Sequence, residues 1–549
     1  MSLPNRLVLP IILSSLAVLA GCGSGTKNPT APPAGAFGNT NFNGTYTFSV
    51  LGFDANSSEF AMAGSLTACG CAAGTIAGGS VDVVDNTGTD SAAALGSNST
   101  YSITSDGRGF ARLFITPTGG TAFEIDVDFV LTSSSHGLIT RYDGSGTGSG
   151  TIDLQTAVAQ SGLASVPFAF SLSGTDLAGE PLAQVGAFTL DSSGNISASG
   201  ANAGVADTTL YNISTFTATP YADSPLTGVL QVGSGTTPGT AALKTSFSPL
   251  APLTFDVYAV DSTHLKLIEN DGLEILVGDV FTQPSASIPS GNMVFSMAGP
   301  DPGGNPFAAA GLMASDGSSQ ITSGSEDLND DGVVDFGSNP VAPQGFSGTF
   351  SATGGGRFLV TLSTFAGGTT FAAYPSSGGL LMQEIDSGAG SGVTSGVALA
   401  QTSGASIAAS QGYGLDLTGV DLSNLNPVEF DEIAEFQATS SGLSGLLDAN
   451  DGGGLGTSNL SGTYAVGTDG VGSAKLTNGF QGMFFYPADS STALLLSTDP
   501  FVVGTGTFEV QTTPSQAAAM ERPRALSVFR PVPHPGSASR ANKAAFVRR

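Results

Sequence analysis

The sequence predicts an all-β protein built from four tandem antiparallel β-meander units. Glycine is abundant, with 77 residues among 549, and only 11% of the residues are charged. Short apolar runs alternate with Gly, Ser, Asp and Asn, which is typical of strands joined by tight turns. A hydrophobic content of 40% with 33 Phe is enough for buried cores. Similar segments recur along the chain, which indicates repeated units.

Residues 1–21 have the layout of a secretory signal peptide. Arg6 precedes an apolar stretch over 7–19, and small residues follow that stretch. The stretch is too short to cross a bilayer as a helix, which takes about 20 residues. The sequence Leu19-Ala20-Gly21-Cys22 resembles the lipobox of bacterial lipoproteins at every position. The resemblance implies a diacylglycerol on the Cys22 thiol, cleavage before that residue, and membrane anchoring through the N-terminal lipid.

Residues 22–41 are expected to form a lipidated tether. The stretch is rich in Gly, Pro, Thr and Asn and has no hydrophobic period, which is typical of a flexible linker. Gly23 follows the lipobox cysteine, at the position where an Asp retains lipoproteins in the inner membrane of enteric-type bacteria. By this resemblance we expect a location in the cell envelope, with the outer membrane favoured.

Four diverged copies of one unit are predicted over residues 42–160, 161–286, 287–405 and 406–513. The opening strand of each copy ends in a glycine, an Asp follows two positions later, and the closing strand ends in a Gln. The residues are Gly52, Gly174, Gly299 and Gly419; Asp54, Asp176, Asp301 and Asp421; and Gln155, Gln283, Gln401 and Gln511. Four tandem copies of one β-unit therefore account for most of the chain.

The strand pattern within a unit favours a closed sheet. From Phe123 to Phe129, apolar residues alternate with carboxylates, so one face of the strand is buried and the other is solvated. Each unit holds roughly seven to nine such runs. An eight-stranded up-and-down barrel leaves no exposed edge and is the predicted form, and a β-sandwich is the alternative. The units resemble the diverged β-repeats of uncharacterised envelope lipoproteins, a resemblance that rests on glycines and aromatics and implies no activity.

Charge is distributed unevenly along the chain. The formal net charge is −28, and residues 23–513 hold 8 Lys and Arg against 43 Asp and Glu. Such an acidic body repels nucleic acid, so we expect no nucleic-acid partner. Residues 514–549 hold seven basic residues and one acid, are rich in Pro, and lie outside the repeats. We expect this basic tail to be disordered.

One segment has the spacing of a calcium loop. Asp327, Asn329, Asp331 and Asp335 occupy positions 1, 3, 5 and 9, and a glycine stands at position 6. Hard cations need several oxygen ligands that converge, and this spacing supplies them. Position 12, where an EF-hand has a bidentate Glu, is Ser338. The sequence therefore leaves two interpretations open, a calcium site or a turn rich in Asp and Asn between strands.

The cysteines do not form a disulfide framework. With Cys22 assigned to the lipid, only Cys69 and Cys71 remain. The Cys-Gly-Cys sequence permits a small disulfide in an oxidising envelope, a pair of free thiols, or a site for a soft metal.

The remaining titratable residues predict structural roles. His136 and His264 occupy the same position in units 1 and 2, which is typical of a turn or edge residue rather than a general base. The E-x-D pairs at 269–271 and 384–386 could serve glycoside hydrolysis. However, the chain has no Trp to line a sugar cleft, so we interpret these pairs as turn residues.

No catalytic motif is found in the sequence: there is no nucleophile elbow, phosphate-binding loop or metalloprotease helix. We therefore predict a non-enzymatic envelope protein with a structural, adhesive or partner-binding role. The expected partner is a protein, a glycan or a small molecule. The alternative is a carrier that holds a small apolar ligand inside its barrels.

Overall fold

The computed structural model describes residues 37–512, except 198, 201–202, 249, 335–343, 364–365, 367, 424–425, 468–469 and 478–481. The predicted signal peptide, Cys22, the predicted tether up to residue 36 and residues 513–549 lie outside the described residues. Among the described residues, no helix is long and apolar enough to cross a membrane.

Unit 1 is an antiparallel sheet in which consecutive strands pair, except β4 and β5, and the last strand, β9, pairs with the first, β1. Pairing of β4 with β6 brings the two ends of the sheet together. Its elements are η1 (Asn39–Asn41), β1 (Asn43–Asp54), β2 (Glu59–Cys69), β3 (Ile76–Asp85), β4 (Gly88–Leu95), β5 (Thr100–Ile103), β6 (Arg108–Thr116), β7 (Phe123–Leu131), β8 (His136–Asp143) and β9 (Gly146–Leu154).

Unit 2 has the same path, and pairing of β14 with β15 closes the sheet. Its elements are α1 (Gln160–Leu163), β10 (Pro167–Asp176), β11 (Pro181–Thr189), β12 (Asn195–Ile196), β13 (Gly204–Asn212), β14 (Thr217–Gln231), β15 (Gly239–Lys244), β16 (Leu253–Ala259), β17 (His264–Glu269) and β18 (Glu274–Thr282).

Unit 3 repeats the arrangement, and pairing of β20 with β21 closes the sheet. Its elements are β19 (Ser290–Pro300), β20 (Pro306–Asp316), β21 (Gln320–Asp330), β22 (Val333–Val334), β23 (Gln344–Gly354), β24 (Arg357–Ser363), β25 (Thr370–Ser376), β26 (Gly379–Glu384), β27 (Gly388–Ala389) and β28 (Ser395–Ala400).

Unit 4 is a closed barrel of eight strands, and the β-sandwich alternative is therefore wrong for this unit. Its strands are β29 (Gly412–Asp421), β30 (Val428–Ala438), β31 (Gly442–Asp451), β32 (Gly454–Val466), β33 (Gly472–Leu476), β34 (Gly482–Pro487), β35 (Thr492–Ser497) and β36 (Val502–Val510). The prediction of four antiparallel all-β units is confirmed.

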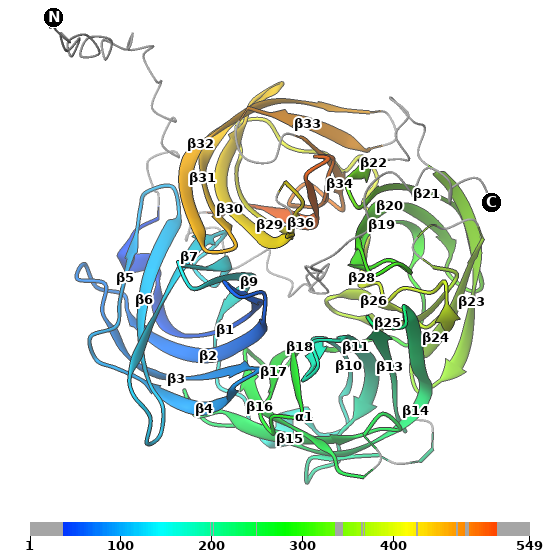
Figure 1. Cartoon of the computed structure of the whole chain (residues 1–549), viewed down its shortest axis with the longest axis horizontal. Coiled ribbons are helices and arrows are strands. Elements are labelled where there is room, and N and C mark those ends of the chain that lie inside the picture. Colours follow the sequence, from blue (N-terminus) through cyan, green and yellow to red (C-terminus); the bar gives the residue numbers. More distant parts are fainter. Residues whose placement is uncertain are drawn as a thin grey trace, which may run out of the picture.

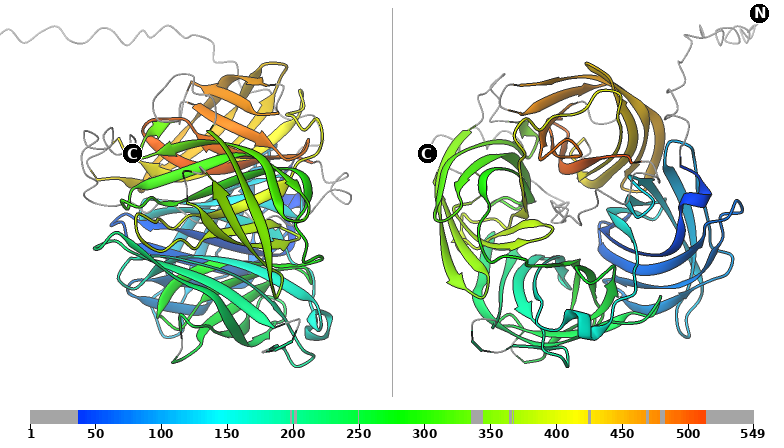
Figure 2. Two further views of the ribbon diagram at one scale, coloured as in Figure 1. Left: turned by 90° about the vertical axis from the view of Figure 1, so that its right-hand side faces the viewer. Right: turned by 180° about the vertical axis from the view of Figure 1, so that it is seen from behind.

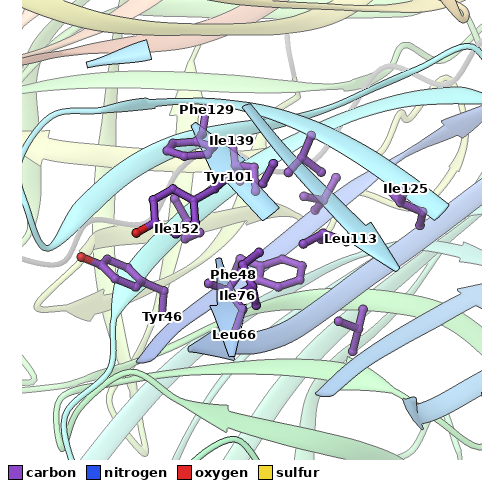
Figure 3. Packing of buried hydrophobic residues seen from close by; sticks show 14 of the residues in the cluster. Tyr46, Phe48, Leu66, Ile76, Tyr101, Leu113, Ile125, Phe129, Ile139 and Ile152 are labelled. Atoms are coloured by element: carbon purple, nitrogen blue, oxygen red, sulfur yellow. The ribbon is translucent and has the colours of Figure 1, made fainter. Parts of the chain in front are cut away.

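Side chains fill the barrel interiors. In unit 1, Phe42 stacks on Tyr46 with ring centroids 3.9 Å apart and on Phe129 at 5.3 Å. Phe48, Leu66, Ile76 and other apolar residues complete this core, shown in Figure 3. The other three barrels have their own apolar clusters. An eight-stranded barrel is just wide enough for side chains to fill it, so these interiors are cores rather than channels.

The repeated glycine of the opening strand allows close approach to the closing strand. A Cβ added to Gly52 would lie 2.0 Å from the carbonyl oxygen of Thr147, and one on Gly419 would lie 2.4 Å from that of Val503. Any side chain at these positions would push β1 from β9 or β29 from β36. The recurrence of glycine in the sequence therefore reflects barrel closure.

The four barrels form a ring. Figure 1 shows the units following one another around a common centre, from unit 1 in blue to unit 4 in orange, with unit 4 beside unit 1. The view from behind in Figure 2 shows the same order. Each contact between neighbouring units is called a seam here: seam 1–2, seam 2–3, seam 3–4 and seam 4–1. Seam 4–1 joins the two ends of the array, which the sequence did not predict.

Candidate functional site

The seams share a buried aspartate on the third barrel strand of each unit. The strand registers place Asp82, Asp207, Asp327 and Asp448 at the same position, because they pair with Ala63, Val185, Ala310 and Ile433. All four are buried and lie against the following unit around the ring. A carboxylate buried at such a place requires a partner.

Tyrosines of the next unit supply that partner at three seams. The hydroxyl of Tyr258 donates to Asp82 at 2.5 Å, and that of Tyr374 donates to Asp207 at 2.6 Å. The hydroxyl of Tyr486 donates to Asp327. Burial, followed by the charge of Asp256, raises the pKa of Asp82 to about 8. This carboxyl is therefore largely protonated at neutral pH.

Arginines reinforce two of the seams. The guanidinium of Arg357 holds both oxygens of Asp207 at 2.7 Å, a bidentate pair with almost no exposure. Arg108 contacts Asp448 at 3.1 Å across seam 4–1 and also holds Asp106 of its own unit. Next to this pair, burial and the charge of Asp448 raise the pKa of Asp128 to about 8.

The glutamine that ends each closing strand also crosses a seam. The side-chain amides of Gln155, Gln283 and Gln401 donate to the carbonyl oxygens of Ala259, Gly356 and Pro487 in the next unit, at 2.7, 3.3 and 3.0 Å. The amide of Gln511 donates to the carbonyls of Asp106 and Leu131 in unit 1. The same contact therefore occurs at all four seams, and the repeated Gln of the sequence is a residue of ring assembly.

Two of the predicted calcium ligands lie at seam 3–4. Asp327 and Asn329 belong to β21, and the amide of Asn329 donates to the carbonyls of Ser497, Asp499 and Val502 in unit 4 at 3.0–3.1 Å. Asn450 occupies the same position in unit 4. Its amide donates to the carbonyls of Arg141, Asp143 and Gly146 in unit 1. The Asp-x-Asn spacing thus has a role in both units that needs no ion.

The rest of the calcium motif forms a tight turn. Asp331 and Gly332 have φ angles of 52° and 78° and lead from β21 into β22. Asp-Gly is typical of such a two-residue hairpin turn. Asp335 lies outside the described residues. The described residues contain no group of three or more His, Cys, Asp or Glu arranged to hold a metal, and calcium binding at this loop stays a prediction.

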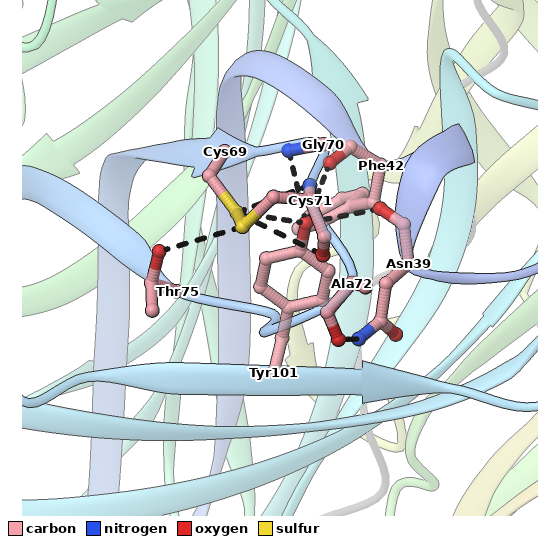
Figure 4. Close-up of a disulfide and its surroundings, with 8 residues drawn as sticks. All are labelled: Asn39, Phe42, Cys69, Gly70, Cys71, Ala72, Thr75 and Tyr101. Carbon is pink, nitrogen blue, oxygen red and sulfur yellow. Dashed lines mark hydrogen bonds between the residues drawn. A yellow bond between two sulfur atoms is a disulfide. The ribbon is translucent and has the colours of Figure 1, made fainter.

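Cys69 and Cys71 are joined by a disulfide at the end of β2. Figure 4 shows the turn around it, where the hydroxyl of Tyr101 accepts from the backbone N–H of Gly70 at 3.1 Å and donates to the carbonyl of Phe42 at 3.0 Å. The disulfide closes the turn itself, and Tyr101 ties the turn to the segment that precedes β1. Neither sulfur lies at a seam.

His136 and His264, the histidines at the same position of units 1 and 2, lie in one line of ionisable side chains. His136 contacts Asp153 at 2.6 Å through Nδ1 and Glu509 of unit 4 at 3.2 Å through Nε2. His264 contacts Asp279 at 2.7 Å. Sequence analysis assigned both to turns or edges, and both stand at the first position of a strand, β8 or β17. Asp153 and Asp279 lie on the strands paired with β8 and β17, whereas Glu509 comes from unit 4, and that contact carried no signal in the sequence.

Lys266 connects the two halves of this line of ionisable side chains. Its role was not predicted from the sequence. Its ammonium is fully buried and contacts Asp153 at 3.2 Å, Asp279 at 3.1 Å and the hydroxyl of Thr151 at 2.6 Å. A lysine inside a strand usually indicates a solvated face. Here that face is covered by unit 1, which a single unit's pattern cannot reveal.

The E-x-D pairs are turn residues with one buried member each. Asp271 accepts from the backbone N–H of Thr254 at 2.7 Å, and Asp386 from that of Thr369 at 2.5 Å. Burial raises the pKa of Glu269 to about 9 and that of Glu384 to about 8. The glutamates point into different barrels, so the pairs do not converge in one cleft.

A cavity of about 380 Å³ opens at one end of barrel 4. Its walls combine apolar side chains, among them Phe430 and Phe501, with the carboxylates of Asp421, Glu432 and Asp499. Burial and the charge of Asp421 raise the pKa of the adjacent Asp451 to about 6. The mouth of this barrel is therefore aromatic and acidic, with no basic residue among its lining.

No family model matches the chain, and no curated protein matches it. Among solved structures, the chain is similar to a mutant of the vaccine antigen transferrin binding protein B (TbpB) from Haemophilus parasuis Hp5. The two share 9% sequence identity over 69% of this chain and 83% of that chain, with a TM-score of 0.13. A likeness this low carries no argument about fold or function.

Proposed function

We propose that the protein is a lipid-anchored protein of the cell envelope that serves as a rigid, non-enzymatic binding platform. The lipobox at Cys22 supports the anchor. The observation that carries the platform role is the closed ring, in which the same Asp and Gln positions hold every unit to the next. Four barrels locked in this way keep surface residues of distant segments in fixed relative positions.

The distribution of reactive groups supports a non-enzymatic role. Catalysis needs titratable groups that converge on an open site. Several of the described side chains that stand out by burial are instead engaged across seams, as Asp207, Arg357 and Tyr374 are. Their use in assembly explains their burial without a substrate.

The alternative function, binding of a small molecule, is better supported at the mouth of one barrel than inside the barrels. Side chains fill the interiors, so an apolar ligand inside them is disfavoured. The cavity of barrel 4 is of ligand size. Carboxylates beside aromatic rings attract organic cations, so the second candidate function is binding of a small organic cation through Asp421, Asp499 and Phe501.

The anchor is tested by metabolic labelling with an alkyne-tagged fatty acid and by membrane fractionation. The wild-type protein should carry the label and sediment with the envelope, whereas Cys22→Ser should lose both properties. A variant with Cys69→Ser and Cys71→Ser is the matched control, because it removes the other two cysteines and should keep the label. Label retained by Cys22→Ser would overturn the proposed anchor.

The cation site is tested with choline and its uncharged isostere 3,3-dimethylbutanol. NMR titration of the wild-type protein should show binding of choline alone. Asp499→Asn and Phe501→Ala should each weaken it, because they remove one carboxylate charge and one exposed ring. Equal binding of both probes, or of neither, would reject this candidate while leaving the anchored platform intact.

A further inference from the structure

Six ionisable side chains form a continuous line across three units. From unit 4 to unit 2 the order is Glu509, His136, Asp153, Lys266, Asp279 and His264, with successive contacts between 2.6 and 3.2 Å. The line crosses seam 4–1 once and seam 1–2 once. We call it the charge chain.

Acids and bases alternate along the charge chain. With the His136 imidazole protonated, a cation lies between Glu509 and Asp153. With that imidazole neutral, both carboxylates lose this cationic neighbour, and Asp153 keeps Lys266. Removing a positive charge therefore leaves buried carboxylates with incomplete compensation, which is costly in a low-dielectric seam.

The charge chain replaces apolar residues of the repeat. Lys266 pairs with Asp279 across β17 and β18. The same positions hold Leu381 and Val397 in unit 3 and Leu494 and Thr507 in unit 4. Seams 2–3 and 3–4 accordingly share one apolar cluster. Among the described residues, an imidazole contacts a carboxylate of another unit only at seam 4–1.

We propose that the charge chain is a pH-sensitive latch, which holds unit 1 against unit 4 while His136 is protonated and loosens seam 4–1 when His136 loses its proton. Little else holds that seam by apolar contact, since its cluster consists of Val130, Leu138 and Ile433. The groups that face His136 are Asp153 from β9 and Glu509 from β36. Those that face His264 are Asp279 and the ring of Phe281, stacked at 4.5 Å.

The direction of the effect follows from linkage. Although burial opposes the charge, Glu509 and Asp153 raise the pKa of His136 well above 6.5. A base whose pKa is raised in the closed ring stabilises that ring fully below its open-state pKa, about 6.5, and the stabilisation is lost as pH rises through the closed-state pKa. Over that window the open fraction should rise about tenfold per pH unit.

Other groups at the same seams also titrate and must be separated from His136. Burial, with a nearby carboxylate in each case, raises the pKa of Asp82 at seam 1–2 and of Asp128 and Glu435 at seam 4–1 to about 8. These carboxyls remain in a His136→Gln variant. The difference between wild type and variant therefore isolates the imidazole.

The test is hydrogen exchange measured by mass spectrometry between pH 6 and 9, corrected for intrinsic exchange rates. In the wild type, β8 and β30, which pack on each other across seam 4–1, should lose protection with rising pH more steeply than β21 and β34 at seam 3–4. In His136→Gln, the part of this slope due to the imidazole should disappear. Equal slopes in wild type and variant, or equal slopes at seams 4–1 and 3–4, would overturn the proposal.

A second measurement needs no variant. The chain has three histidines, and His534 in the tail serves as an internal reference. NMR titration of the wild-type protein should give His136 a midpoint well above that of His534. A His136 midpoint at or below the reference would overturn the proposal even if His136→Gln failed to fold.

Discussion

The seams among units 2, 3 and 4 differ in kind from the seam that closes the ring. One apolar cluster runs through units 2, 3 and 4 and includes Val185, Tyr374, Leu381 and Tyr486. Seam 4–1 has an apolar cluster of three residues. In place of apolar contact it has Arg108 on Asp448 and the carboxylate of Asp431, which accepts from hydroxyls of unit 1.

The two kinds of seam therefore contribute different properties: apolar seams stabilise the ring, and the polar seam fixes the geometry in which units 4 and 1 meet. Apolar burial is non-directional and tolerates small shifts, so it suits neighbours that a short linker already holds together. Units 4 and 1 have no such linker, so their alignment depends on the contacts of the seam itself. Hydrogen bonds and ion pairs give less net stability but require a defined geometry. We infer that seam 4–1 specifies correct closure, while seams 2–3 and 3–4 supply most of the cohesion.

The largest expected effect is the loss of the buried ammonium at seam 1–2. Lys266→Met leaves Asp153 and Asp279 without their shared cation and should lower the free energy of unfolding by about 3–5 kcal/mol. Chemical denaturation measures the change. The matched control combines Lys266→Leu with Asp279→Val, which copies Leu381 and Val397 of unit 3, and should recover part of the loss. A control as unstable as Lys266→Met would show that seam 1–2 cannot be made apolar.

The next largest effect is expected when either of the two equivalent asparagines, Asn329 or Asn450, is replaced. Asn329→Ala and Asn450→Ala each remove an amide that donates to three carbonyls, and each should cost about 1–3 kcal/mol. Only Asn450→Ala, at the closing seam, should also increase the radius of gyration in X-ray scattering. An equal increase for Asn329→Ala would contradict the division between cohesive and closing seams.

A smaller effect concerns a barrel interior rather than a seam. Burial raises the pKa of Glu384 from about 4.5 to about 8, so its neutral form stabilises the fold at low pH, and this contribution is lost as pH rises from about 4.5 through about 8. Within that window the loss should approach about 1.4 kcal/mol per pH unit per proton. Glu384→Gln should flatten that part of the dependence of Tm on pH between about 5 and 8. An unchanged slope would mean that other groups account for the loss of stability over this range.

The smallest expected effect is that of calcium removal. Because Asp327 and Asn329 contact Tyr486 and the carbonyls of unit 4, we expect EGTA to leave Tm unchanged. Differential scanning calorimetry with and without added calcium measures this. A drop in Tm that Asp331→Ala abolishes would instead support the calcium interpretation of the loop.

The fold of each unit could be predicted from the sequence because it depends on local patterns. The alternation of apolar and acidic residues over 123–129 indicates burial of one strand face, and the recurring glycine at the Gly52 position indicates close approach of two strands, both within one unit. Ring closure could not be predicted in this way. The repeated Gln155 position is visible in the sequence, but its partner is a backbone carbonyl of another unit, and carbonyls carry no sequence signal.

The calcium interpretation shows that the same residue spacing fits two backbone geometries, a curled loop and a β-strand. On a curled loop, Asp327 and Asn329 would converge on an ion, whereas on a strand residues two apart share a face. They lie on β21, and that face meets unit 4. The equivalent Asp448 and Asn450 carried the same information. A pair that unit 4 retains without the rest of the motif is better explained by a contact that both units make.

The direction in which the barrels contact one another has a consequence for assembly. Each unit presents an aspartate face to one neighbour and a tyrosine or arginine face to the other, so the contact is heterologous. Repeated heterologous contacts give either a closed ring or an open filament, depending on whether the rotation between neighbours closes. Four units bring the last face of the chain onto the first. Because both end faces are covered within one molecule, no seam face remains to start a fibre between neighbouring copies.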